Sequence, residues 1–149
     1  MLPIRDIRLT IGELLAADVA FLAAAAANKI ALITAAFNPG EDLVFADLTL
    51  ATFTGGEPKG GVAGAQQAGV DPATSDQVIT ILAPVGGWRW ECTVDPASPE
   101  TVYGYALVDD AVAVLLGTEL LQEPLVIQQA GEFIDIGSVT MTIVAEPIS

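Results

Sequence analysis

Apolar and polar residues alternate along short stretches of this chain, most clearly in its second half. Between residues 88 and 94, for example, the apolar Trp88, Trp90 and Cys92 alternate with polar residues. Alternation with a period of two places one set of side chains on each face of a strand, so these stretches predict half-buried strands. The predicted strands are residues 30–37, 48–53, 77–82, 88–94, 101–108, 111–116 (unless this segment begins a short helix), 124–128 and 138–144.

The predicted strands recur at intervals of about ten residues and are separated by turn signals such as Asn38-Pro39-Gly40. Regular spacing of this kind is typical of β-sandwiches and β-barrels. No internal repeat or second-domain boundary is visible in residues 1–149. We therefore expect a single, mainly β domain with a sandwich or barrel-like fold.

One helix is predicted ahead of the strands, at about residues 11–27. Thr10 and Glu13 have the spacing of a capping box, in which each side chain bonds a backbone amide of the first turn. The residues that follow are mainly Ala and Leu, which favour helix. The apolar run 14–27 is too short to span a membrane and is interrupted by Asp18. We expect a packed helix here rather than a membrane or targeting segment.

The segment 54–70 contains six glycines and is predicted to be a long loop or an extended arm. Ordering so many glycines costs conformational entropy, so we expect the segment to become ordered when a partner holds it. Its glycine pairs, Gly55-Gly56 and Gly60-Gly61, are candidate partner contacts. Trp88 and Trp90 are further candidates, because aromatic residues that alternate along a strand usually serve a core or an interface.

Composition restricts the function more than the strand pattern does. The chain has a net charge of −14 and no histidine, and Arg89 is the one base among residues 60–149. This excess of acid repels nucleic-acid phosphates, and the lack of histidine argues against most acid–base enzymes and transition-metal sites. Apolar residues make up 52% of the chain and charged residues 16%, which leaves apolar surface for neighbouring subunits and predicts a homo-oligomer.

No catalytic, cofactor-binding or metal-binding residue is predicted. Cys92 is the one cysteine, and without a histidine to activate it we expect a buried structural thiol. We interpret acid pairs such as Glu41-Asp42 and Asp109-Asp110 as turn or surface residues, while an incidental calcium ion at a subunit junction stays open. A carboxylate-dependent glycosidase is the enzymatic alternative that these acids leave.

Two segments resemble a recurrent set of small phage-encoded proteins. They are Ile30-Ala-Leu-Ile-Thr-Ala-Ala-Phe-Asn-Pro-Gly and Ala46-Asp-Leu-Thr-Leu-Ala-Thr-Phe-Thr-Gly, and a later Val102-Tyr103-Gly104-Tyr105 also matches. The resemblance extends loosely from about residue 29 to residue 144, with Gly56 in place of the tyrosine that is usual in the set.

The resemblance implies a structural accessory protein of the virion, assembled in the host cytoplasm, and no reaction. Its most direct form is a capsid decoration protein, whose partners are the major capsid protein or other virion proteins. The alternative is a tail or fibre module that recognises a host surface glycan through Trp88, Trp90, Tyr103 or Tyr105. Copy number per particle distinguishes the two, because decoration proteins are present in many copies and tail tips in few.

Overall fold

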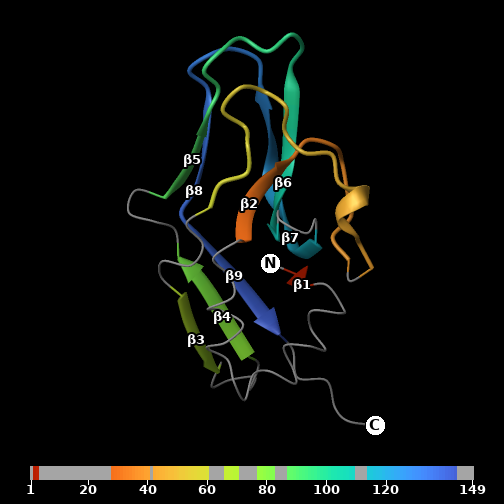
Figure 1. The fold of residues 1–149 in the computed structure, drawn as a ribbon, viewed down its shortest axis with the longest axis vertical. Helices are drawn as coiled ribbons and strands as arrows, with labels where there is room; N and C mark the ends of the chain where they lie inside the picture. Colours follow the sequence, from red (N-terminus) through yellow and green to blue (C-terminus); the bar gives the residue numbers. More distant parts are fainter. Residues whose placement is uncertain are drawn as a thin grey trace.

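A computed structural model describes residues 2–3, 28–40, 42–60, 66–70, 77–82, 87–109 and 114–143, and this part of the chain is mainly β (Figure 1). Its strands are β1 Leu2–Pro3, β2 Asn28–Ile33, β3 Gln66–Val70, β4 Gln77–Leu82, β5 Trp88–Glu91, β6 Glu100–Asp109, β7 Val114–Ile127, β8 Phe133–Ile136 and β9 Ser138–Ile143, and a 3-10 helix, η3, covers Phe45–Asp47. The helix predicted at about residues 11–27 lies outside the described residues.

The described strands pair antiparallel in three sheets. The largest has the order β1-β7-β6-β2, a second has the order β3-β4-β9, and β5 pairs with β8 alone. β6 lies inside the largest sheet because it is apolar on both faces. Its Val102 and the run of residues 104–108 are buried. A strand with two apolar faces needs cover on both sides of its sheet.

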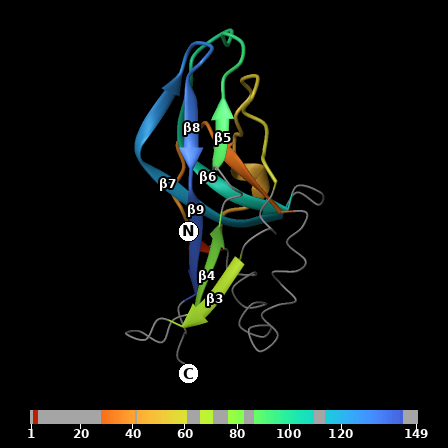
Figure 2. The same ribbon diagram turned by 90° about the vertical axis from the view of Figure 1, so that its left-hand side faces the viewer.

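The β5–β8 ribbon covers one face of the largest sheet (Figure 2). Trp88 and Trp90 from β5 and Ile134 from β8 pack in one buried cluster with Leu32 and Leu107 of the sheet. The alternation predicted for this stretch is confirmed, because Trp88, Trp90 and Cys92 are buried whereas Arg89 and Glu91 are exposed. Cys92 is therefore a buried thiol, as expected.

The segment between β2 and residue 50 covers the opposite face. A second cluster contains Ala31 and Ile33 of β2 and Ala106 and Val108 of β6. The partly buried side chains that pack on it come from this segment and from η3: Phe37, Leu43, Phe45, Leu48 and Leu50. The largest sheet is thus enclosed by the ribbon on one side and by irregular chain on the other.

The β3-β4-β9 sheet extends the ribbon away from these two cores (Figures 1 and 2). β9 follows β8 after one residue, Gly137, whereas residues 83–87 separate β4 from β5. The antiparallel register resumes across this break, from Trp88 opposite Ile136 to Leu82 opposite Ser138. Val139 of β9 is 1% exposed and belongs to the ribbon's core, so the extension is anchored in the body.

The structure corrects several strand predictions. β2 ends at Ile33 rather than at residue 37, because the Thr34 amide and hydroxyl bond to the carbonyls of Thr49 and Leu50. Residues 48–53 do not form a strand and contribute only the isolated bridge between Ile33 and Leu50. β8 is not among the predicted strands, because the glycines at residues 131 and 137 that flank it are typical of turns. β3 lies within the glycine-rich segment that was expected to lack regular structure.

Residues 114–116 and 124–127 of two predicted strands, 111–116 and 124–128, belong to one long strand, β7, and residues 111–113 lie outside the described residues. The pairing of β7 with β6 shifts in register, from Leu125 opposite Val102 to Leu120 opposite Gly104, so residues 121–124 bulge opposite Tyr103. Gly104 permits this approach, because a Cβ there would lie 2.2 Å from the Glu119 carbonyl oxygen and 2.9 Å from the Phe37 ring. The bulge brings extra polar residues into a strand that the sequence pattern divides in two.

Candidate functional site

Trp88 and Trp90, predicted as partner contacts, are core residues with exposed fractions of 2% and 0%. The Trp88 indole N–H donates to the Gly60 carbonyl at 2.9 Å, and that of Trp90 donates to the Glu57 carbonyl at 3.0 Å. Their rings are therefore unavailable to a partner in this conformation, which corrects the expectation. The strong preference of indoles for burial with a satisfied N–H explains the outcome.

The four candidate glycines do not form one exposed arm. Gly55 has a φ of +100°, Gly56 is buried against Phe53, and Gly60 is exposed with open space around it, while Gly61 lies outside the described residues. Residues 54–60 form an ordered turn below the two indoles, and Lys59 pairs with Ile30 through two backbone hydrogen bonds of 2.9 Å. For residues 54–60, the expectation that the segment becomes ordered only when a partner holds it is wrong.

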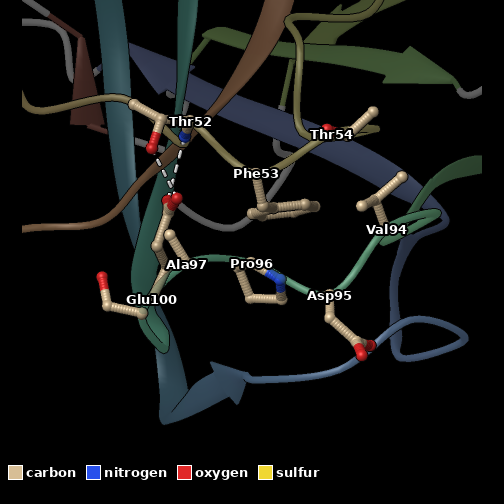
Figure 3. Close-up of a pocket in the computed structure, with 9 residues that line it drawn as sticks. Thr52, Phe53, Thr54, Val94, Asp95, Pro96, Ala97 and Glu100 are labelled. Atoms are coloured by element: carbon tan, nitrogen blue, oxygen red, sulfur yellow. Dashed lines mark hydrogen bonds between the residues drawn. The ribbon is translucent and has the colours of Figure 1, made fainter.

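Acidic side chains near the loops accept hydrogen bonds from backbone amides. Glu100 accepts from the Thr52 amide at 2.9 Å and from its hydroxyl at 2.5 Å (Figure 3), and Asp95 accepts from the Ala130 amide at 2.8 Å. Glu132 accepts from the Gln128 amide at 2.7 Å. The positions were not predicted individually, because each partner lies far from its acid in the sequence or within an unpredicted turn. Of the acid pairs singled out from the sequence, Asp42 lies in a turn and Asp109 ends β6, while Glu41 and Asp110 lie outside the described residues.

The same chemistry shifts the pKa of Glu57. Backbone hydrogen bonds, first from its own amide and then from Gly55, hold the pKa of this carboxyl below its usual value. The Gly55 amide lies 3.3 Å from Glu57 Oε1. Hydrogen bonds to a carboxylate stabilise its charged form, so Glu57 stays ionised while it holds the turn.

An open hollow of about 230 Å³ lies between residues 52–54 and the loop 94–100 (Figure 3). Phe53 and Pro96 line it, and Thr52 and Glu100 close one end through their hydrogen bonds. The hollow is smaller than the roughly 300–1,000 Å³ of typical small-molecule sites. Its carboxylates Asp95 and Glu100 already hold backbone amides.

Apolar side chains are exposed along β7 and at the start of β8. Leu120 is 46% exposed, Leu125 43%, Val126 49% and Phe133 50%. We call these four residues the β7–β8 apolar set. Leu125 and Val126 are neighbours on a strand, so they point to opposite faces, and both are exposed because this part of β7 lies at the rim of the sheet. Large exposed apolar side chains that gather in one segment mark protein-binding surfaces.

Arg89 lies against one member of this set, Phe133. Its Nε and Nη2 each donate to one carboxylate oxygen of Asp135 at 2.8 Å, and its guanidinium lies 4.2 Å from the centre of the Phe133 ring. The hydrogen bond with Arg89 lowers the pKa of Asp135, and the same bond raises the pKa of Arg89. Phenylalanine and arginine are among the residue types enriched at protein interfaces. In the sequence, Arg89 stands out as the one base among residues 60–149. Phe133 does not stand out, because β8, which it begins, is not among the predicted strands.

Among the described residues, no group of three or more His, Cys, Asp or Glu side chains is placed to hold a metal ion. In the same part of the chain, no helix has the length and apolar character needed to cross a membrane. Comparison with protein-family models, with curated proteins and with solved structures finds no match to this chain.

Proposed function

We propose that this protein is a structural accessory component of a phage virion, a decoration protein that binds neighbouring capsid subunits. The observation that supports the proposal best is the β7–β8 apolar set, with Arg89 fixed against Phe133. Exposed apolar residues of this kind suit binding to another protein, where a few apolar and aromatic anchors supply most of the affinity. The virion setting comes from the sequence resemblance described above.

The partner surface should be apolar at its centre and basic at its margin. The chain has a net charge of −14, and Glu119 and Glu123 lie within β7 itself. Complementary charge at the rim of an interface speeds and orients association, while the apolar centre supplies the binding energy. A basic rim on the major capsid protein would meet both requirements.

The glycan-binding alternative gains nothing from the structure. Two of its four aromatic residues, Trp88 and Trp90, have exposed fractions of 2% and 0%. Tyr105 is 8% exposed, and its hydroxyl donates to a Glu119 carboxylate oxygen at 2.5 Å. A sugar needs an exposed aromatic face on which to stack, and of the four residues Tyr103 alone is partly exposed.

The finer description of the fold belongs to the same proposal. We expect the described sheets to form part of a single β-sandwich or barrel-like domain, with an N-terminal helix at about residues 11–27. The packing of the β5–β8 ribbon over the largest sheet supports the two-layer arrangement. A structure of the protein bound to its particle would test both features.

The test of the function uses phage particles assembled without this protein, to which purified chain is added. Wild-type protein should bind the head saturably and in many copies, as counted by quantitative mass spectrometry and located by cryo-electron microscopy. Leu125→Asp should weaken binding by about tenfold. The exposed part of the leucine, about half of its side chain, can then no longer be buried by the partner, and a carboxylate is placed in an apolar contact.

Gln122→Asp is the matched control, since it adds the same charge at an exposed position of the same strand. Its affinity should stay within about twofold of the wild-type value. Binding in a few copies at the tail would overturn the proposal. So would equal effects of the two substitutions, because binding would then depend on charge and not on the apolar set.

A further inference from the structure

The strands at the sheet edges differ in how they are protected against pairing with another chain. β7 contains Pro124 and the bulge opposite Tyr103, and β1 contains Pro3. On β2, the bridges to Lys59 and Leu50 occupy its outer side. Bulges, prolines and covering segments are the usual devices that keep sheet edges from joining.

β3 has none of these devices. Its sequence, Gln66-Gln-Ala-Gly-Val, contains no charge and no proline, and its register with β4 runs without a shift from Gln66 opposite Ile81 to Val70 opposite Gln77. Among the described residues, no strand pairs with the other side of β3. At the opposite edge of the sheet, β9 lies beside β1. Among the described strands, β3 therefore forms the edge of this sheet that has no partner on its outer side.

The whole β3-β4-β9 sheet is also free of charge. β4 reads Gln-Val-Ile-Thr-Ile-Leu and β9 reads Ser-Val-Thr-Met-Thr-Ile, so no acid or base lies on any of its three strands. The rest of the chain bears the whole net charge of −14. Two copies that approach through their bodies repel each other, whereas two copies that approach through these strands place no like-charged strand residues opposite each other.

We propose that β3 pairs antiparallel with β3 of a second copy of this chain, which joins two three-stranded sheets into one continuous sheet across a twofold axis. Identical antiparallel edges are self-complementary, as a twofold interface requires, and the backbone amides and carbonyls along β3 supply the hydrogen bonds. The inference does not depend on the virion function proposed above, because it concerns the isolated protein.

The pairing should be weak in free solution. β3 has five residues, so one strand pair buries much less than the roughly 1,200–2,000 Å² of stable interfaces. The dimer should therefore appear only as the protein concentration rises. Copies held next to one another on a larger assembly would pair more readily, because tethering raises their effective concentration.

Sedimentation velocity over about a hundredfold range of protein concentration tests the proposal, since dimerisation follows mass action. The wild-type chain should pass from monomer to dimer. Ala68→Lys should raise the dissociation constant at least about tenfold, because pairing centred on residue 68 would place two lysines opposite each other. Gln67→Lys should also weaken the dimer, because in this register the two new lysines lie diagonally across the strand pair on the other face of the sheet.

Gln129→Lys is the matched control, because it makes the same change in net charge on an exposed turn of the body. All three substitutions reduce the net negative charge, which favours association of the bodies, so loss of the dimer only in the β3 variants would locate the contact. Far-UV circular dichroism and the Tm must match wild type. A wild-type monomer at the highest soluble concentration, or dimers that survive both β3 substitutions, would overturn the inference.

Discussion

Residue 55 is glycine because the backbone there leaves no room for a side chain. Its φ is +100°, and a Cβ would lie 1.9 Å from the Glu91 carbonyl oxygen. Gly55→Ala combines an unfavourable backbone conformation with a clash against backbone that cannot move aside. The free energy of unfolding should fall by about 3 kcal/mol, as measured by urea denaturation.

Two other glycines separate these causes. Gly131 has a φ of +93° with nothing near its Cβ position, so Gly131→Ala should cost about 1 kcal/mol through conformation alone. Gly60 has open space around it and no positive φ, so Gly60→Ala should change stability by less than about 0.5 kcal/mol. Equal losses at Gly55 and Gly131 would show that the clash with Glu91 is absent.

Tyr105 makes stability depend on pH in the alkaline range. Burial, followed by the hydrogen bond to Glu119, raises the pKa of its phenol. In the unfolded chain the phenol ionises near pH 10, so above this pH the unfolded state loses a proton that the folded state keeps. The stabilising contribution is therefore complete below about pH 10 and is lost as the pH rises further.

Between about pH 10 and 11 the wild-type protein should lose up to about 1.4 kcal/mol more per pH unit than Tyr105→Phe, which cannot ionise. Urea unfolding at a series of pH values gives this difference. Parallel stability curves for the two proteins would mean that the phenol ionises equally easily in the folded and unfolded states.

At the scale of elements, the turn at residues 54–60 depends on the ribbon above it. Lys59 is bonded to Ile30 through its amide and carbonyl, and the carbonyl of Gly60 accepts from Trp88. Trypsin should therefore cleave after Lys59 only when the turn opens. Trp88→Phe removes the indole donor and should raise the cleavage rate at this bond several-fold, as followed by mass spectrometry.

Ile136→Val is the control, because Ile136 pairs directly with Trp88 and its loss of one buried methylene costs about 1 kcal/mol without removing a bond to the turn. Cleavage after Lys59 should rise less in this variant than in Trp88→Phe when both are compared at equal global stability. Rapid cleavage of the wild-type chain would restore the interpretation of these residues as a loose arm.

The sequence pattern predicted most of the strands whose faces differ in polarity. β4, β5, β6 and β9 were located from alternation or from apolar runs, and the apolar face predicted for β5 is the face that the structure buries. Alternation reports one buried face directly, so strands that pack one face against a core are the easiest to find.

The remaining elements depend on tertiary contacts that no local pattern records. β7 continues through Pro124 because β6 accommodates a bulge at Gly104, and Phe133, at the start of β8, is half exposed beneath Arg89. For the candidate site, the sequence identified Trp88 and Trp90 as important but not their burial. The exposed Leu125 and Val126 lie within the predicted strand 124–128, and without the sheet order they could not be distinguished from core residues.

At the scale of the whole molecule, the charge of −14 opposes contacts between the bodies of two copies and contacts with an acidic surface. If the β7–β8 apolar set supplies most of the binding energy on a particle, occupancy should change little as salt is raised, because screening weakens the attraction at a basic rim and the repulsion between neighbouring copies together. Screening shortens the range of the repulsion from about 10 Å at 0.1 M salt to about 3 Å at 1 M, while apolar burial is retained.

Particle occupancy across a salt series, measured by sedimenting the particles and quantifying the bound chain, tests this expectation. Leu125→Asp in the same series shows whether the apolar contact is responsible, since its residual binding should not recover fully at high salt. Release of the wild-type protein as salt rises would mean that ion pairs, and not the apolar set, hold it.

The two connections between the β5–β8 ribbon and the β3-β4-β9 sheet differ in length, and this difference has a mechanical consequence. One residue, Gly137, links β8 to β9, whereas five residues link β4 to β5. If the β3-β4-β9 sheet were pulled away from the body, the shorter connection would become taut first. The load would then reach Ile136 and Val139, which are 7% and 1% exposed in the core, before the longer connection bore any of it. Gly137 is thus the point at which a force on the outer sheet would be transmitted to the tryptophan core.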